Sequence, residues 1–214
     1  MEQIISYKGL IFLAGLFLSY LLGSLPPAYV LVRVIKKQDI RQLGSGNVGA
    51  TNASRILGKR WGIFVLGIDI LKALIPVIVI ADYILGKVNF FSEDALRLIL
   101  GFSAVSGHSW PLFLRFKGGK AVASTFGVML GLALKINGFF WILISLVIIW
   151  IIVFLFSRIV SLASVFTAFF LPFLMVVFKQ SKETVLMSLL FSFLIISKHI
   201  PNIQRVIQKK EPRL

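Results

Sequence analysis

The residues best suited to chemistry lie in one polar, glycine-rich segment, Gly44 to Arg55, between two long apolar runs. Glycines let backbone N–H groups converge on an anion, and hydroxyl, amide and guanidinium groups supply further donors. We therefore expect this segment to bind phosphate. Its expected site residues are Gly44, Ser45, Gly46, Asn47, Thr51, Asn52 and Arg55.

The same segment begins with the pattern G-x-G-x-x-G, which in a soluble βαβ unit would indicate a dinucleotide-binding turn. Here the basic run Arg33–Lys37, at the end of an apolar stretch, precedes the pattern in place of a core strand. We therefore do not expect a nucleotide-binding fold.

Three further polar clusters follow along the chain. Each combines cations, hydroxyls or amides with almost no acids, which again suits a phosphate group. Any single cluster could be a plain turn with cationic membrane anchors, but four such clusters together favour a binding site. The members are Lys117, Gly118, Gly119 and Lys120; then Ser157, Arg158, Ser161 and Ser164; then His199, Asn202 and Arg205.

Both histidines have a structural and a functional interpretation. His108 stands just before Trp110 and Pro111, where it is either a hydrogen-bonded structural residue or part of the phosphate site. His199 either caps carbonyl groups or acts in the site. Asn202 would share a helical face with His199 if the helix continues past the intervening proline.

Asp69 and Lys72 are charged residues inside an apolar run, three positions apart and so on one helical face. Unpaired, each would cost about 2.5–3.5 kcal/mol within a membrane. We expect a structural pair that supports the site from beneath; a proton or ion relay is the alternative.

The composition requires a membrane environment. Of the 214 residues 58% are hydrophobic and 14% charged, and the mean hydropathy is +0.94, so most of the chain cannot face water. The chain has no cysteine, two histidines and eight acids. We therefore expect no disulfide, no metal site and no cofactor.

The hydrophobic pattern predicts an all-α, polytopic integral membrane protein, with residues 1–214 forming a single domain. The first run has no cleavage site and is expected to be a retained helix. The segment at 121–134 is short, so five spans with a re-entrant piece is the alternative to seven. The seven expected spans are 10–34, 61–85, 95–114, 121–134, 139–156, 160–178 and 184–196.

Charge sets the expected orientation. With seven spans, one side of the membrane holds sixteen Lys and Arg against only Asp39 and Glu211, whereas the other holds six against five acids. By the positive-inside rule the first side is cytoplasmic, the N-terminus is outside and the C-terminus is inside. All four polar clusters then lie on the cytoplasmic side. This bias accounts for part of the net charge of +15, and we expect no nucleic-acid partner.

Four motifs in order give a resemblance to a known family. They are G-S-G-N-x-G-A-T-N-x-x-R at 44–55, G-H-x-W-P-x-F-L-x-F-K-G-G-K at 107–120, S-R-x-V-S-L-x-S at 157–164 and H-x-x-N-I-x-R at 199–205. With them the chain resembles the bacterial acyl-phosphate-dependent glycerol-3-phosphate acyltransferases of the PlsY type. Two residues depart from the family pattern: Ala121 stands where glycine is usual, and Trp110 where phenylalanine is usual.

The resemblance implies transfer of a fatty acyl group from acyl phosphate to the 1-hydroxyl of glycerol 3-phosphate. The products are lysophosphatidic acid and phosphate, formed at the cytoplasmic face of a bacterial inner membrane in phospholipid biosynthesis. It implies no partner beyond substrates and membrane lipids, and a monomer is possible. A structural role is implied for Glu211. The resemblance makes Ser45 and Arg55 essential, the loop through Gly118, Gly119 and Lys120 phosphate-binding, and His199 and Asn202 part of the active site. From the residues and the resemblance together we expect Ser45, Arg55, Lys120, His199 and Asn202 to be catalytic, and His108, Lys117, Gly118, Gly119, Ser161 and Ser164 to be among the phosphate-binding residues.

Other functions fit the residues less well. A histidine–aspartate acyltransferase needs an aspartate separated from the histidine by four residues, but Phe113 occupies that position after His108. A metal-dependent phosphotransferase needs an aspartate cluster. A transporter or flippase of phosphorylated lipids remains the alternative, with Asp69 and Lys72 lining its path.

Overall fold

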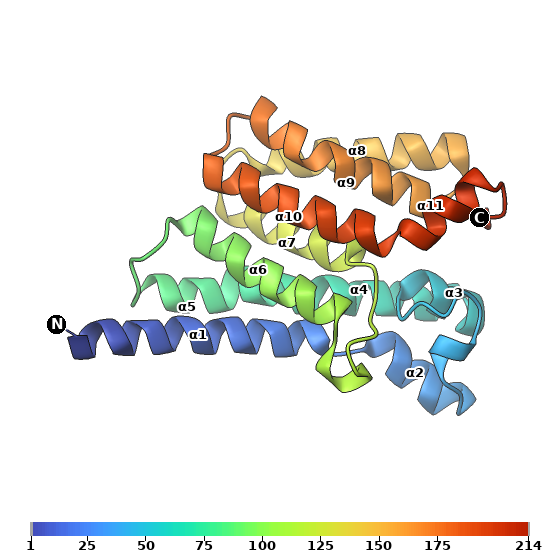
Figure 1. The fold of residues 1–214 in the computed structure, drawn as a ribbon, viewed down its shortest axis with the longest axis horizontal. Helices are drawn as coiled ribbons and strands as arrows, with labels where there is room; N and C mark the ends of the chain where they lie inside the picture. Colours follow the sequence, from blue (N-terminus) through green and yellow to red (C-terminus); the bar gives the residue numbers. More distant parts are fainter. Residues whose placement is uncertain (1, 214) are drawn as a thin grey trace. The chain divides into compact units, whose positions relative to one another are not determined.

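The structure is a computed structural model that describes residues 2–213, with side chains from Tyr7 to Arg213. Within these residues every regular element is helical and there is no strand. The chain divides into two compact units, one ending at Gly131 and the other starting at Leu132. Figure 1 shows the helices of each unit, coloured along the chain from blue at the N-terminus to red at the C-terminus.

The N-terminal unit contains two helices that are interrupted where proline removes a backbone donor. The first breaks at Leu25 and Pro26, and the second passes through a π-helical turn that begins at Pro76. The elements are α1 (Glu2–Ser24), α2 (Pro27–Lys36), η1 (Ile40–Gln42), α3 (Ala50–Leu57), α4 (Lys59–Ile75), η2 (Pro76–Ile80), α5 (Ala81–Leu85), α6 (Glu93–Ser109), η3 (Leu112–Leu114) and the start of α7 (Val122–Lys135).

Helices α1 and α6 pack closely because glycines remove side chains at their crossing. A Cβ atom on Gly23 would lie 1.9 Å from the carbonyl oxygen of Ala104, and one on Gly107 would lie 2.2 Å from that of Tyr20. The Tyr20 hydroxyl also donates to the Trp110 carbonyl at 2.7 Å. The end of α6, and the loop that follows it, are thereby fixed against α1.

Arg97 stabilises the interrupted second helix. It is 3% exposed, and its guanidinium donates to the Val77 carbonyl in the π-helical turn and to the carboxylates of Asp82 and Glu93 at 2.6 Å each. Arg97 thus ties the π-helical turn to α6 and to the start of α5.

The C-terminal unit is a helical layer in which α9 contacts both α8 and α10. Its helices are α8 (Phe139–Ser157), α9 (Val160–Val177), α10 (Lys182–Lys198) and α11 (Ile200–Ile207). Ser192 on α10 donates to the Ala168 carbonyl on α9 at 2.6 Å. The axis bends by 57° between α10 and α11, at His199, which ends α10 and caps α11. Helix α11 continues through Pro201 and contains Asn202.

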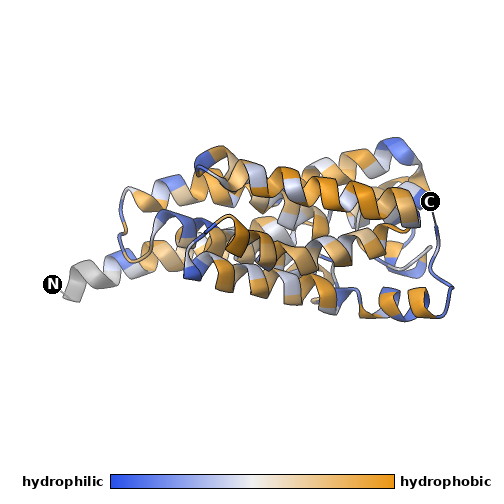
Figure 2. Ribbon diagram, turned by 90° about the horizontal axis from the view of Figure 1, so that it is seen from above, coloured by the Kyte–Doolittle hydropathy of each residue, from blue (hydrophilic) through white to orange (hydrophobic). Residues whose placement is uncertain are grey.

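Length and composition allow four of the described helical stretches to cross a membrane, or five if the bent α10–α11 pair counts as one span. Figure 2 shows hydrophobic residues along the helices of each unit and hydrophilic ones mainly in loops and at helix ends. The predicted all-helical membrane class is confirmed. Helix α6 has 17 residues and α7 has 14, and by length alone neither counts as a membrane-spanning helix. The seven crossings therefore stay a prediction. The four spans are Tyr7–Lys36, Lys59–Leu85, Phe139–Ser157 and Val160–Val177.

Candidate active site

The polar segment that begins at residue 44 is entered through a short capped turn. The Asp39 side chain accepts the backbone N–H of Arg41 at 2.9 Å, as an N-cap does, and binds the Arg41 guanidinium through both oxygens. The hydrogen bonds from Arg41 hold the pKa of the Asp39 carboxyl below its usual value. Arg41 is therefore paired with Asp39 within the turn.

Asn52 organises the loop that contains Ser45. Its side chain is fully buried, and its Oδ1 accepts the N–H of Ser45 at 2.9 Å. Its Nδ2 donates to the carbonyls of Leu43 at 3.0 Å and Asn47 at 3.1 Å. These contacts use the donors and the acceptor of the amide within the protein, so the structure gives Asn52 a positioning role.

The loop requires two glycines and presents two polar side chains. Gly44 and Gly46 have φ of +58° and +70°, in the region that favours glycine, and a Cβ on Gly44 would lie 2.3 Å from Asn52 Oδ1. Ser45 and Arg55 are exposed, whereas Asn47 and Thr51 are half-buried. The structure thus brings the predicted residues 44–55 together around one turn and the N-terminal part of α3.

The second loop, residues 115–121, has an unusual backbone. Arg115, Phe116 and Ala121 have φ of +53°, +62° and +68°, values that cost a residue with a Cβ about 1–2 kcal/mol each. Strain of this kind concentrates at functional sites. Ala121 occupies the position where the family usually has glycine, and the backbone explains that preference.

The two glycines of this loop lie directly on His108. The Gly119 N–H donates to the His108 carbonyl at 3.0 Å. A Cβ on Gly119 would lie 2.0 Å from Nε2 of the imidazole, and one on Gly118 would lie 2.3 Å from the same carbonyl. His108 is 6% exposed, so it lies beneath the loop rather than on its surface. The predicted contact of His108 with substrate stays a prediction.

Beneath His108 lies the buried pair on α4. Asp69 Oδ1 is 2.8 Å from Lys72 Nζ, which confirms the expected pair, and 3.4 Å from His108 Nδ1. Lys72 also donates to the carbonyl of Leu25 at 2.8 Å, at the break between α1 and α2. The three side chains therefore connect α4, α6 and the α1–α2 break.

A small cavity adjoins this buried cluster, between the α1–α2 break and the glycines of the second loop. Its volume is about 10 Å³, near the lower limit for one water molecule. A phosphate does not fit there, so an anion would have to bind on the outer side of the glycines. The lining includes Leu25, Lys72, His108, Gly118 and Gly119.

In the C-terminal unit, Glu211 gathers three of the polar residues. Its carboxylate accepts hydrogen bonds from Ser161 at 2.7 Å, from Asn202 and from Arg205 Nε at 2.7 Å. Burial raises the pKa of Glu211, but the hydrogen bonds from Asn202, Ser161 and Arg205 outweigh it, so the pKa lies below its usual value. The contacts fasten the tail to α9 and α11, in agreement with the structural role implied for Glu211.

His199 lies at the junction of α10 and α11 and is 3% exposed. Its Nδ1 is 2.8 Å from the Ile195 carbonyl, and because a carbonyl oxygen can only accept, Nδ1 bears a hydrogen. Ser164 donates to the Val160 carbonyl and accepts from Trp150. Its hydroxyl is thus engaged within the unit.

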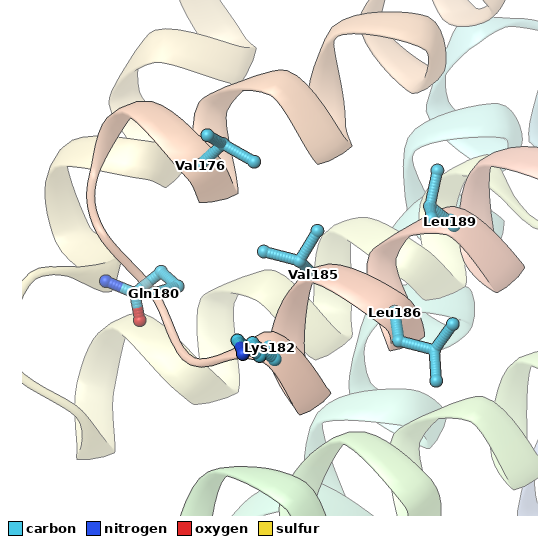
Figure 3. Close-up of a pocket in the computed structure, with 6 residues that line it drawn as sticks. All are labelled: Val176, Gln180, Lys182, Val185, Leu186 and Leu189. Atoms are coloured by element: carbon cyan, nitrogen blue, oxygen red, sulfur yellow. The ribbon is translucent and has the colours of Figure 1, made fainter.

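A cavity in the C-terminal unit is lined by none of these residues. It has a volume of about 460 Å³ and lies where α9 turns into α10 (Figure 3). Its walls are mainly aliphatic, and the polar groups of Gln180 and Lys182 stand at one side. None of the predicted site residues lines it, so it is an apolar groove and not the site of the chemistry.

Some of these contacts could not be predicted from the sequence. The contact of Asp69 with His108 spans 39 positions and two helices, and the hydrogen bonds of Asn52 depend on how the loop turns back on α3. Next to Gly118 and Gly119, the predicted residues Lys117 and Lys120 are exposed and half-buried, respectively.

Together these features define a class of protein: a helical integral membrane protein with cations and glycine-rich turns at its helix ends. The chain belongs to the glycerol-3-phosphate acyltransferase family, whose model matches residues 13–209. The predicted family and the prediction of an acyltransferase are confirmed by this match.

Individual relatives agree. A glycerol-3-phosphate acyltransferase of Prochlorococcus marinus (strain NATL1A) is 41% identical over 207 residues, covering 93% of this chain and 96% of that protein. One from Parasynechococcus marenigrum (strain WH8102) is 40% identical over 203 residues, covering 93% and 88%.

Two solved structures are similar over 95% of both chains. The crystal structure of PlsY (YgiH), an integral membrane glycerol 3-phosphate acyltransferase, in its glycerol 3-phosphate form has a TM-score of 0.84 and 32% identity. Its lysophosphatidic acid form has a TM-score of 0.80 and 31% identity.

Proposed function

We propose that the chain transfers a fatty acyl group from acyl phosphate to the 1-hydroxyl of glycerol 3-phosphate. The hydroxyl oxygen attacks the acyl carbonyl, the bond from the carbonyl carbon to the phosphate oxygen breaks, and lysophosphatidic acid and inorganic phosphate are released. An acyl phosphate is a mixed anhydride with a good leaving group, so no covalent enzyme intermediate is needed. The work of the protein is to align two anions and to stabilise the oxyanion.

The observation that carries the proposal is the loop that Asn52 holds in place. It leaves the Ser45 hydroxyl and the Arg55 guanidinium exposed, and among the described residues no hydrogen bond or ion pair engages the Arg55 side chain. We assign to Arg55 and Lys120 the neutralisation of phosphate charge, and to Ser45 donation to the acyl carbonyl or its phosphate. The N–H groups of Gly44 and Gly118 add backbone donors, whereas those of Gly46 and Gly119 already donate to the carbonyls of Leu43 and His108.

In the C-terminal unit we assign roles in the same reaction to His199 and Asn202. A neutral His199 with its hydrogen on Nδ1 has a basic Nε2, which suits removal of the proton from the attacking hydroxyl. The phosphate of the substrate is the alternative base. Asn202 already donates to Glu211, so its contribution includes holding the segment in which His199 stands.

We further propose that the chain crosses a bacterial inner membrane seven times, with its N-terminus outside, its polar loops in the cytoplasm and a monomer as the active form. The positive-inside distribution supports the orientation. Apolar helices α6 and α7 support the additional crossings, because glycines allow them to pack closely with neighbours: a Cβ on Gly127 would lie 2.2 Å from the Ile70 carbonyl.

The test is a donor comparison with purified protein and labelled glycerol 3-phosphate. Acyl phosphate and acyl-CoA are supplied in parallel, and lysophosphatidic acid is measured. Product from acyl phosphate alone is the expected result. Product only from acyl-CoA would refute the donor assignment, and none from either would refute the acyl transfer itself.

A further inference from the structure

We infer that Asp69 and His108 are positioning residues for the glycerol 3-phosphate site: His108 supports the glycine loop, with its imidazole against Gly119 and its backbone carbonyl against Gly118, and Asp69 fixes that imidazole. The inference rests on the proposed function in one respect, that the loop through Gly118 and Gly119 binds the phosphate of glycerol 3-phosphate.

The first support is the contact between the loop and the ring. Gly119 is buried, and its missing Cβ would meet Nε2, Cε1 and Cδ2 of His108 at 2.0, 2.7 and 2.9 Å. The Gly119 backbone therefore lies against the Nε2 edge of the imidazole. The height and tilt of the ring decide where the N–H groups of the loop point, and a misplacement of 1 Å at a binding group can cost about 100-fold in rate.

The second support is the fixing of the ring. Nδ1 of His108 lies 3.4 Å from Asp69 Oδ1, and side chains of both residues are at most 6% exposed. Asp69 is in turn held by Lys72 at 2.8 Å. A buried carboxylate between two cationic or donor groups gives the imidazole a defined orientation, as a carboxylate does for other functional histidines.

The third support is the connection to α1 and α2. Lys72 donates to the Leu25 carbonyl, one of the carbonyls that the break before Pro26 deprives of a helical partner. The same cluster thus holds the break and the glycine loop at once. A buried charge cluster is costly in a membrane. A turn that only connects two helices would not need such a cluster beneath it.

The experiment uses the purified full-length chain with Asp69→Asn and His108→Gln, and Arg97→Gln as the control. Arg97 is a buried charge of the same unit in contact with Asp82 and Glu93, so its loss lowers stability without touching the glycine loop. We expect the first two variants to raise the KM for glycerol 3-phosphate roughly 10- to 100-fold, with an unchanged KM for acyl phosphate and nearly unchanged kcat. The control is expected to lower the Tm and leave both KM values unchanged. An unaltered KM for glycerol 3-phosphate in both variants would overturn the inference.

A double-mutant cycle supplies an independent readout. Gly119→Ala is expected to raise the KM for glycerol 3-phosphate because its methyl group would collide with His108. In the His108→Ala background the collision is absent, so the same substitution is expected to have a much smaller effect. Equal effects of Gly119→Ala in both backgrounds would show that the ring does not support the loop.

Hydrogen exchange separates the inference from the proposed function. The peptide that contains residues 115–121 is expected to exchange faster in Asp69→Asn than in the wild type, and at the wild-type rate in Arg97→Gln. Faster exchange in a protein whose wild type forms no lysophosphatidic acid would retain the positioning role and refute the proposed function. Unchanged exchange would refute the positioning role even in an active enzyme.

Discussion

The amide oxygen of Asn52 accepts the backbone N–H of Ser45 at 2.9 Å, seven positions earlier in the chain. Through this bond a fully buried side chain on α3 fixes the turn that presents the exposed serine. The bond explains why an asparagine, with both a donor and an acceptor, is needed at a position that never faces solvent.

Asn52→Asp is expected to reduce both stability and activity. The substitution replaces the Nδ2 donor by an oxygen that faces the carbonyls of Leu43 and Asn47, and each buried group left unsatisfied costs about 1–3 kcal/mol. Denaturation in detergent measures the stability, and lysophosphatidic acid formation measures activity. Gln42→Ala, at an exposed position of η1, is the control, and equal behaviour of the two variants would contradict the role of Asn52.

Ala121→Gly is expected to be close to neutral, whereas Ala121→Val is expected to be strongly destabilising. Relief of the positive φ favours glycine by about 1–2 kcal/mol, but loss of a buried methyl group costs about 0.8 kcal/mol and the added backbone freedom about 0.5–1 kcal/mol. Valine adds branching at a positive φ and overpacks a fully buried position. Thermal unfolding of the three proteins checks this order, and a more stable valine variant would contradict it.

The attachment of the C-terminal tail is expected to weaken in acid. The pKa of Glu211 is lower in the folded chain than in the unfolded one, so its contribution to stability is complete above the unfolded pKa. The contribution disappears as the pH falls through the lower folded pKa. Hydrogen exchange or proteolysis of the tail as a function of pH measures this, with Glu211→Gln expected to expose the tail already at neutral pH. A variant with a wild-type profile would show that the carboxylate does not hold the tail.

The sequence was sufficient for the positions of most helices, because long apolar runs bounded by cations define them. The expected span 139–156 is α8, Phe139–Ser157, and 160–178 is α9, Val160–Val177. Periodicity alone also predicted the Asp69–Lys72 pair. It did not predict the π-helical turn at Pro76, which depends on Arg97 from a later helix.

The candidate site was predictable by residue type but not by role. Composition identified cations, glycines and hydroxyls, whereas their division into positioning and exposed groups depends on long-range contacts. Asn52 and Ser45 look equally polar in the sequence, and only the turn buries one and exposes the other. In the sequence, Ala121 is a minor departure from the family pattern. Its φ of +68° explains why glycine is usual at that position.

The proposed orientation can be tested with single cysteines, since the natural chain has none. We expect Asn137→Cys to react with a membrane-impermeant maleimide from outside the cell, and Arg115→Cys and Gln208→Cys only after permeabilisation. Arg115 distinguishes seven crossings from five with a re-entrant segment, which would leave it unreactive from both sides. Labelling of Gln208→Cys in intact cells would contradict the topology.

The most direct test of the central claim is the stoichiometry of one reaction. Purified protein receives acyl phosphate and glycerol 3-phosphate, and inorganic phosphate and lysophosphatidic acid are measured together, with Arg55→Ala as the comparison. We predict one phosphate for each lysophosphatidic acid, no phosphate release without glycerol 3-phosphate, and neither product from folded Arg55→Ala. Phosphate release without the acceptor, or full activity of Arg55→Ala, would contradict the account.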